Sequence, residues 1–70
     1  MKVLVTGGSG FIGRNIISEC NKRGWETVSF DIAPKNSDAN FHITESVMNL
    51  AHLKKAMNDV DYVFHLAAVT

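Results

Sequence analysis

Apolar residues follow two kinds of spacing along this chain, and each kind predicts a different element. Residues 2–6 form a short apolar, β-branched run, which is typical of a parallel strand covered on both faces. Residues 62–66 repeat that pattern and predict another buried strand. Residues 25–30 alternate between apolar and polar positions and predict a strand that ends at Asp31, and residues 41–43 predict a short edge strand.

Helical spacing appears first over residues 11–22. The apolar and small residues of this segment recur at intervals of three and four positions, so one stripe of the helix is expected to face the sheet. Gly24 follows, where helices commonly end in a left-handed glycine. The stripe consists of Gly13, Ile16, Ile17 and Cys20.

A second helix is predicted to start after Asn49, whose side chain can cap the first turn, and to stop near Asn58. Residues 33–40, between the second and third strands, are rich in turn formers and predict a polar loop. The order strand, helix, strand, strand, helix, strand favours an α/β fold with a parallel sheet. We expect the third strand to lie beside the second, then the first and the fourth. One face of the second helix is expected to carry Leu50, Leu53 and Met57.

Composition excludes several classes of function. The chain has 70 residues, of which 46% are apolar and 20% charged, as in globular proteins with a thin core. Seven basic residues balance seven acidic ones, which argues against nucleic acid or an anionic membrane as a partner. Cys20 is the only cysteine, so no internal disulfide forms and a reducing compartment is favoured.

Targeting and metal-binding signals are likewise missing from the sequence. We find no signal peptide and no apolar run long enough for a membrane span, so a cytoplasmic location is expected. The three histidines lack the spacing of metal ligands, and no metal site is predicted.

The segment from Thr6 to Gly13 joins the first strand to the first helix and is rich in glycine. A helix N-terminus presents unpaired N–H groups and a positive dipole end, which suit a pyrophosphate. Gly7 permits a tight exit from the strand, Gly10 lets a phosphate approach the backbone, and Gly13 lets the helix lie close to the strand. Local turn geometry alone is the other explanation for these glycines. The preceding strand, the following helix and a downstream acid favour a dinucleotide site.

Neighbouring residues favour NAD among the nucleotides. A P-loop would need Lys and Ser or Thr where Arg14 and Asn15 stand. Asp31, eighteen residues after Gly13, can accept hydrogen bonds from both hydroxyls of an adenosine ribose and would repel the 2′-phosphate of NADP. Lys35 is the nearest cation after Asp31 in the sequence, and its positive charge leaves open some binding of NADP. A turn-forming role at the strand end is the other explanation for Asp31.

The chain contains two motifs, Thr6-Gly7-x-x-Gly10-x-x-Gly13 and His65-Leu66-Ala67-Ala68, and an acid, Asp31, between them. In combination they resemble the extended short-chain dehydrogenases/reductases, in particular the NAD-dependent sugar-nucleotide epimerase/dehydratase family. The resemblance covers nearly the whole chain. It implies that residues 1–70 are the N-terminal half of a Rossmann-type, doubly wound parallel sheet. The catalytic and substrate-binding parts of a longer enzyme would then follow Thr70.

The resemblance also implies twelve cofactor-binding residues, two of which, Phe11 and Ile12, would act through backbone amides. At the position of Ser46 the family commonly has an acid, so adenine recognition here would lack charge assistance. The implied residues are Gly7, Gly10, Phe11, Ile12 and Gly13 at the pyrophosphate, Asp31 and Ile32 at the adenosine ribose, Ser46 and Val47 at the adenine, and Leu66, Ala67 and Ala68 along the wall beside the dinucleotide.

No catalytic residue is assigned. The family's proton-transfer pair is Tyr-x-x-x-Lys, whereas Tyr62, the only tyrosine, has Leu66 four positions on. The resemblance implies a parent enzyme in which NAD removes a hydride from a nucleotide sugar and later returns it. It also allows the parent enzyme to be a homodimer. A non-catalytic, dinucleotide-sensing regulatory module of the same fold is the alternative, because a fold does not prove turnover.

Overall fold

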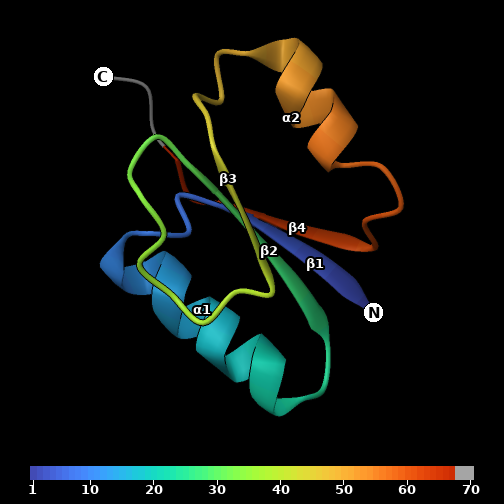
Figure 1. Ribbon diagram of the computed structural model, residues 1–70. Helices are drawn as coiled ribbons and strands as arrows, with labels where there is room; N and C mark the ends of the chain where they lie inside the picture. Colours follow the sequence, from blue (N-terminus) through green and yellow to red (C-terminus); the bar gives the residue numbers. More distant parts are fainter. Residues whose placement is uncertain (68–70) are drawn as a thin grey trace.

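The computed structural model describes residues 1–67, and Ala68, Val69 and Thr70 lie outside the described residues (Figure 1). Its six elements follow the order expected from the sequence. They are β1 (Lys2–Thr6), α1 (Phe11–Lys22), β2 (Glu26–Asp31), β3 (Phe41–Thr44), α2 (Leu50–Ala56) and β4 (Tyr62–His65).

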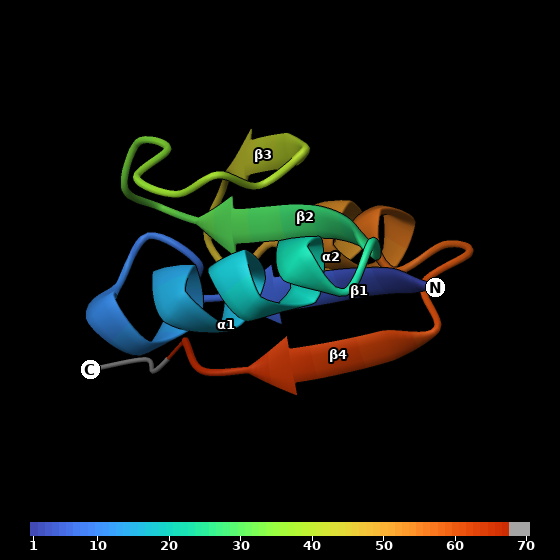
Figure 2. The ribbon, with the colours of Figure 1, turned by 90° about the horizontal axis from the view of Figure 1, so that it is seen from below.

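The four strands form one parallel sheet in the order β3-β2-β1-β4, as predicted. The helices cover opposite faces of this sheet: Figure 2 shows α1 in front of it and α2 behind it. Residues 33–40 form the predicted loop between β2 and β3 without regular secondary structure. Since all strands run in one direction, the turn after β1, the loop after β2 and the segment after β4 meet at the same edge of the sheet.

The core lies on both faces of β1 and β2. On one face, Val3 and Val5 pack with Ile17 and Cys20 of α1, so the stripe predicted for this helix is confirmed. Gly24 has a φ of +77°, which confirms the left-handed end of α1. On the other face, the core consists of Leu4, Val28 and Phe30.

The predicted apolar face of α2 is wrong at two positions. The helix has only seven residues and ends at Ala56, close to the predicted stop near Asn58, and Met57 is its C-cap at the start of the turn that follows. Leu53 and Ala56 pack on the sheet, whereas Leu50, at the first helical position, is 72% exposed. Such a short helix therefore contacts the sheet through its middle and its last residue, Leu53 and Ala56.

The burial predicted for the last strand is also wrong. β4 ends at His65, and its end residues Tyr62 and His65 are exposed while Val63 and Phe64 are half-buried. Among the described residues β4 is an edge strand that pairs only with β1, so its side chains are covered on one flank alone. Two further findings concern the described part of the chain: no helix there is long and apolar enough to cross a membrane, and no group of three His, Cys, Asp or Glu side chains is placed to hold a metal ion.

Candidate functional site

The glycine-rich turn after β1 starts with a left-handed residue. Gly7 has a φ of +74°, and its N–H donates to the carbonyl of Phe30 in β2 over 2.8 Å. A Cβ on Gly7 would lie 3.0 Å from the backbone nitrogen of Ala67, so the segment after β4 passes directly beside the turn. Both observations agree with the predicted tight exit from the strand.

Two other glycines, Gly8 in the turn and Gly13 in the first turn of α1, are required by close packing of the chain itself. A Cβ on Gly13 would overlap the carbonyl oxygen of Gly7 and lie 2.9 Å from the Cα of Gly8. Gly13 therefore lets α1 lie close to the turn that continues β1, and its closeness to the strand itself stays a prediction. A Cβ on Gly8 would overlap the side chain of Ser29, a requirement that sequence reasoning missed although two successive glycines, Gly7 and Gly8, signal it.

Gly10 differs from these glycines because no contact within residues 1–67 requires it. It is the N-cap of α1 with φ −77° and ψ 170°, a conformation open to any residue. A Cβ there would meet only the carbonyl oxygen of Gly7, at an ordinary 3.4 Å. Within residues 1–67 no side chain caps this helix end, and the first helical hydrogen bond runs from the Arg14 N–H to the Gly10 carbonyl. A side chain at residue 10 would therefore fill the space beside the amides at the start of α1, and glycine leaves that space free.

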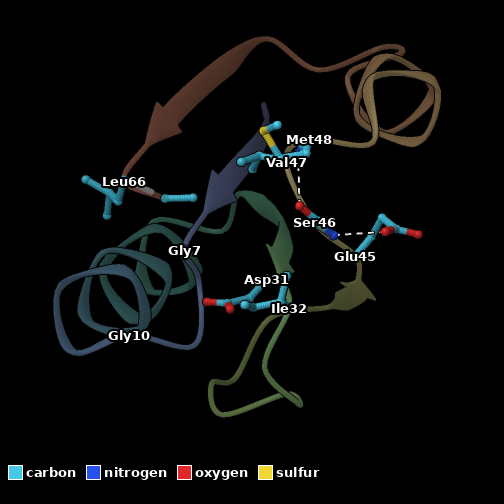
Figure 3. A pocket seen from close by; sticks show the side chains of 10 residues that line it. Gly7, Gly10, Asp31, Ile32, Glu45, Ser46, Val47, Met48 and Leu66 are labelled. Carbon is cyan, nitrogen blue, oxygen red and sulfur yellow. Dashed lines mark hydrogen bonds between the residues drawn. The ribbon is translucent and has the colours of Figure 1, made fainter. Parts of the chain in front are cut away.

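A groove of about 440 Å³ begins at this turn. It brings together residues from the turn, the end of β2, the segment after β3 and the segment after β4 (Figure 3). Eight of the twelve predicted residues line it; Phe11, Ile12 and Gly13 lie next to it in α1, and Ala68 is outside the described residues. The lining consists of Gly7, Gly10, Asp31, Ile32, Glu45, Ser46, Val47, Met48, Leu66 and Ala67.

The carboxylate of Asp31 is held in one orientation by two backbone amides. Its Oδ2 accepts from the N–H of Ser9 over 3.0 Å, and its Oδ1 accepts from the N–H of Ala33 over 2.9 Å. Figure 3 shows the carboxylate directed toward the glycine-rich turn. A carboxylate has about four acceptor positions, so two remain for a ligand in the groove.

A hydroxyl group fixes the wall of the groove. Thr6 is fully buried at the end of β1, and its Oγ1 accepts from the N–H groups of Leu66 and Ala67 over 3.0 and 3.3 Å. The same Oγ1 lies 2.8 Å from Nδ1 of His65. Because the oxygen already accepts two hydrogen bonds, its own proton is directed at Nδ1. Thr6 and His65 therefore position the predicted residues 66 and 67.

The segment after β3 contains a carboxylate that the sequence analysis did not assign. Glu45, directly before Ser46, accepts from the Ser46 N–H through Oε1 over 2.9 Å and contacts Nδ1 of His52 through Oε2 over 2.7 Å. The backbone hydrogen bond from Ser46, followed by the hydrogen bond with His52, lowers the pKa of Glu45 below its ordinary value. Ser46 Oγ accepts from the N–H of Met48 over 3.1 Å. In Figure 3 the Glu45 side chain turns away from the centre of the groove.

Tyr62 lies at the opposite end of the sheet from the groove. It pairs in register with Val3 at the start of β1, whereas the groove lies where the strands end. Its ring packs against Phe64 with centroids 4.9 Å apart. The geometry therefore gives Tyr62 no contact with the groove.

Known proteins resemble this chain in both sequence and fold. It is 41% identical over 69 residues to a UDP-2-acetamido-2,6-beta-L-arabino-hexul-4-ose reductase of Pseudomonas aeruginosa, covering 99% of this chain and 15% of that protein. It is 38% identical over 71 residues to a 3-beta-hydroxysteroid dehydrogenase of Mycolicibacterium neoaurum, covering 97% of this chain and 19% of that protein. A short-chain dehydrogenase/reductase superfamily protein from Agrobacterium tumefaciens, solved with bound NAD, matches with a TM-score of 0.87 and 27% identity, over 100% of this chain and 21% of that one.

These matches confirm the fold class and the predicted resemblance. The chain spans about a fifth of the length of the curated relatives it matches. The model of the NAD dependent epimerase/dehydratase family matches residues 3–70, which is nearly all of the chain, and the chain therefore belongs to that family.

Proposed function

We propose that the groove binds the adenosine diphosphate half of NAD. The observation that carries the proposal is Gly10, because the described residues leave open the space above this glycine and the amides of the α1 N-terminus that border it. A pyrophosphate is the group that such a helix end accommodates, through N–H donors and the positive end of the helix dipole.

Asp31 and Ile32 would take the adenosine ribose at the next position along the groove. Two acceptor positions of the Asp31 carboxylate remain free for the ribose hydroxyls, while a 2′-phosphate would face its negative charge. Lys35, the nearest cation in sequence, is exposed and does not line the groove. These features favour NAD over NADP.

The adenine would lie between the apolar residues Ile32, Val47 and Met48, with Ser46 at its edge. Leu66 and Ala67 would form the wall along the rest of the cofactor, and a smooth apolar surface suits flat rings. In this arrangement the chain binds and orients the cofactor, and NAD supplies the hydride chemistry.

For the whole protein we propose an oxidoreductase that transfers a hydride between NAD and a carbon of a nucleotide sugar. The Pseudomonas relative, whose name is that of a reductase of a UDP-linked sugar, supports this substrate class. The hydroxysteroid dehydrogenase among the relatives supports only the broader class of hydride transfer. The residues that choose the substrate would lie in the part of the protein beyond this chain, as the share of the relatives that it covers indicates.

Replacing Asp31 tests the proposal in the intact protein. Asp31→Ala should weaken NAD binding by about tenfold, because hydrogen bonds to a charged group contribute about 1.5–3 kcal/mol. Adding Ile32→Arg should shift the preference toward NADP by supplying a cation for its 2′-phosphate. Titration calorimetry with both cofactors gives the ratio of the two affinities.

Asp38→Ala is the matched control, since Asp38 is an exposed carboxylate in the loop that follows Asp31 and does not line the groove. It should leave both affinities at the wild-type value. Unchanged affinities for NAD and NADP in the Asp31 variants would remove Asp31 from the site and contradict the proposal.

A further inference from the structure

The loop after β2 follows directly on Asp31, the last residue of that strand, and it has no regular secondary structure to hold it. Side-chain contacts hold it instead. From the glycine-rich turn, Ser9 Oγ donates to the carbonyl of Pro34 over 2.7 Å. From β3, the ring of His42 contacts the carbonyl of Ala33. The contact of His42 with Ala33 lies outside the proposed cofactor site, and that site gives it no role.

His42 bridges two strands and the loop through both ring nitrogens. It pairs in register with Ser29 of β2, and its Nδ1 lies 2.9 Å from the Oγ of Ser29, which is fully buried. Its Nε2 lies 3.1 Å from the carbonyl oxygen of Ala33. Since a carbonyl oxygen only accepts, Nε2 carries the proton and donates, and in the neutral ring Nδ1 accepts from the Ser29 hydroxyl.

Ala33 connects this ring to the predicted ribose site, because its N–H and its carbonyl, which lie on either side of its Cα, bond to different partners. Its carbonyl accepts from His42, while the N–H of the same residue donates to Oδ1 of Asp31 over 2.9 Å. Oδ2 of Asp31 is held by the Ser9 N–H, and Ser29 packs directly against Gly8. Hydrogen bonds and packing therefore form a closed circuit from the glycine-rich turn through β2 and β3 to the carboxylate and back to the turn.

From this circuit we propose that His42 is a positioning residue that gives the groove its preference for NAD over NADP. The inference rests on the proposed function of the groove. With the Ala33 carbonyl held, the Asp31 carboxylate cannot turn away from the ribose position, so it accepts from the 2′-hydroxyl of NAD and repels the 2′-phosphate of NADP. Without that hold, the Ala33 N–H can shift away from Oδ1 and leave the carboxylate with the Ser9 N–H alone, so both effects weaken together.

The test compares variants of His42 in the intact protein. His42→Phe keeps a ring of similar shape but removes both nitrogens, and we expect NAD affinity to fall by about tenfold while NADP affinity stays level or rises. His42→Gln keeps one donor and one acceptor on a planar amide, and we expect it to restore most of the NAD/NADP ratio. Ile43→Val, on the opposite face of the same strand among the core residues, is the control and should leave the ratio unchanged.

A purely structural role for His42 would lower both affinities by the same factor, and that result would overturn the inference. If His42→Phe fails to fold, Ser29→Ala decides, because it removes only the hydroxyl at the other end of the ring. We expect Ser29→Ala to lower the NAD/NADP ratio by a smaller factor, and an unchanged ratio would again overturn the inference. If the wild-type protein binds neither cofactor, the proposed function itself is wrong, which separates the two failures.

Discussion

Replacing Gly10 by serine should stabilise the fold slightly and yet weaken cofactor binding. The N-cap conformation of Gly10, with φ −77° and ψ 170°, is one that serine adopts readily. Its Cβ would lie 3.4 Å from the nearest chain atom, the carbonyl oxygen of Gly7, and so meets no obstacle. Serine is among the best N-cap residues, and glycine is weaker by only a few tenths of a kcal/mol, so a gain of about 0.3 kcal/mol is expected.

The effect on NAD should have the opposite sign and be larger. A capping serine hydroxyl would accept from the amides of the first turn of α1, which are the amides proposed to receive the pyrophosphate. A hydrogen bond to a charged group contributes about 1.5–3 kcal/mol, and 1.4 kcal/mol corresponds to a factor of ten. Loss of one such bond lowers the NAD affinity about 10- to 150-fold, before any steric effect of the side chain.

Titration calorimetry with NAD and urea unfolding of the same samples measure the two effects side by side. Gly13→Ala is the contrasting variant, because its Cβ would overlap the Gly7 carbonyl. Overpacking costs about 1–3 kcal/mol and the better helix propensity of alanine returns about 1 kcal/mol, so the net loss of stability is about 1 kcal/mol. Wild-type NAD affinity in Gly10→Ser would refute the pyrophosphate assignment. A clear loss of stability in that variant would refute the argument that only a ligand requires the glycine.

Two further predictions concern α2 and the segment before it. Asn49 caps this helix by accepting from the His52 N–H, so Asn49→Ala should lower the free energy of unfolding in urea by about 1 kcal/mol; no change would show that the cap contributes nothing. Glu45 has a lowered pKa, so its contribution to stability is complete above its ordinary value of 4.5 and is lost as the pH falls through the lowered folded value. Glu45→Gln should therefore be less stable than wild type at about pH 6 and equal to it at about pH 2, and a difference that persists in acid would contradict this assignment.

The sequence predicted the sheet well because each strand carries a local signal. The apolar run of β1, the glycines that follow it and the helical stripe of α1 agree with one another, and together they leave one consistent topology. The errors lie where burial depends on distant neighbours. Tyr62 and Leu50 are apolar by pattern, but the strand and the helix that carry them meet few other elements among the described residues.

The site was predicted only in part for the same reason. Spacing within a motif indicated Gly7, Gly10 and Asp31, which do line one groove, and their role in binding NAD stays a prediction. The partner of Gly8 and of His42 could not be read from the sequence, because both contact Ser29, which lies 21 residues from one and 13 from the other. The register of β2 and β3 pairs His42 with Ser29, and the turn after β1 places Gly8 against the same serine.

The position of Glu45 changes the expectation for adenine. The family commonly has an acid at the position of Ser46, whereas this chain has an acid, Glu45, one residue earlier. There the carboxylate is engaged by the Ser46 amide and by His52 and points away from the groove. In the proposed site, recognition of adenine would then depend on apolar contact with Val47 and Met48 and on one serine hydroxyl, which together discriminate weakly between bases. We therefore expect binding energy and selectivity to be concentrated at the proposed pyrophosphate and ribose positions, so that substitutions at Gly10, Asp31 and His42 have the largest effects on the cofactor.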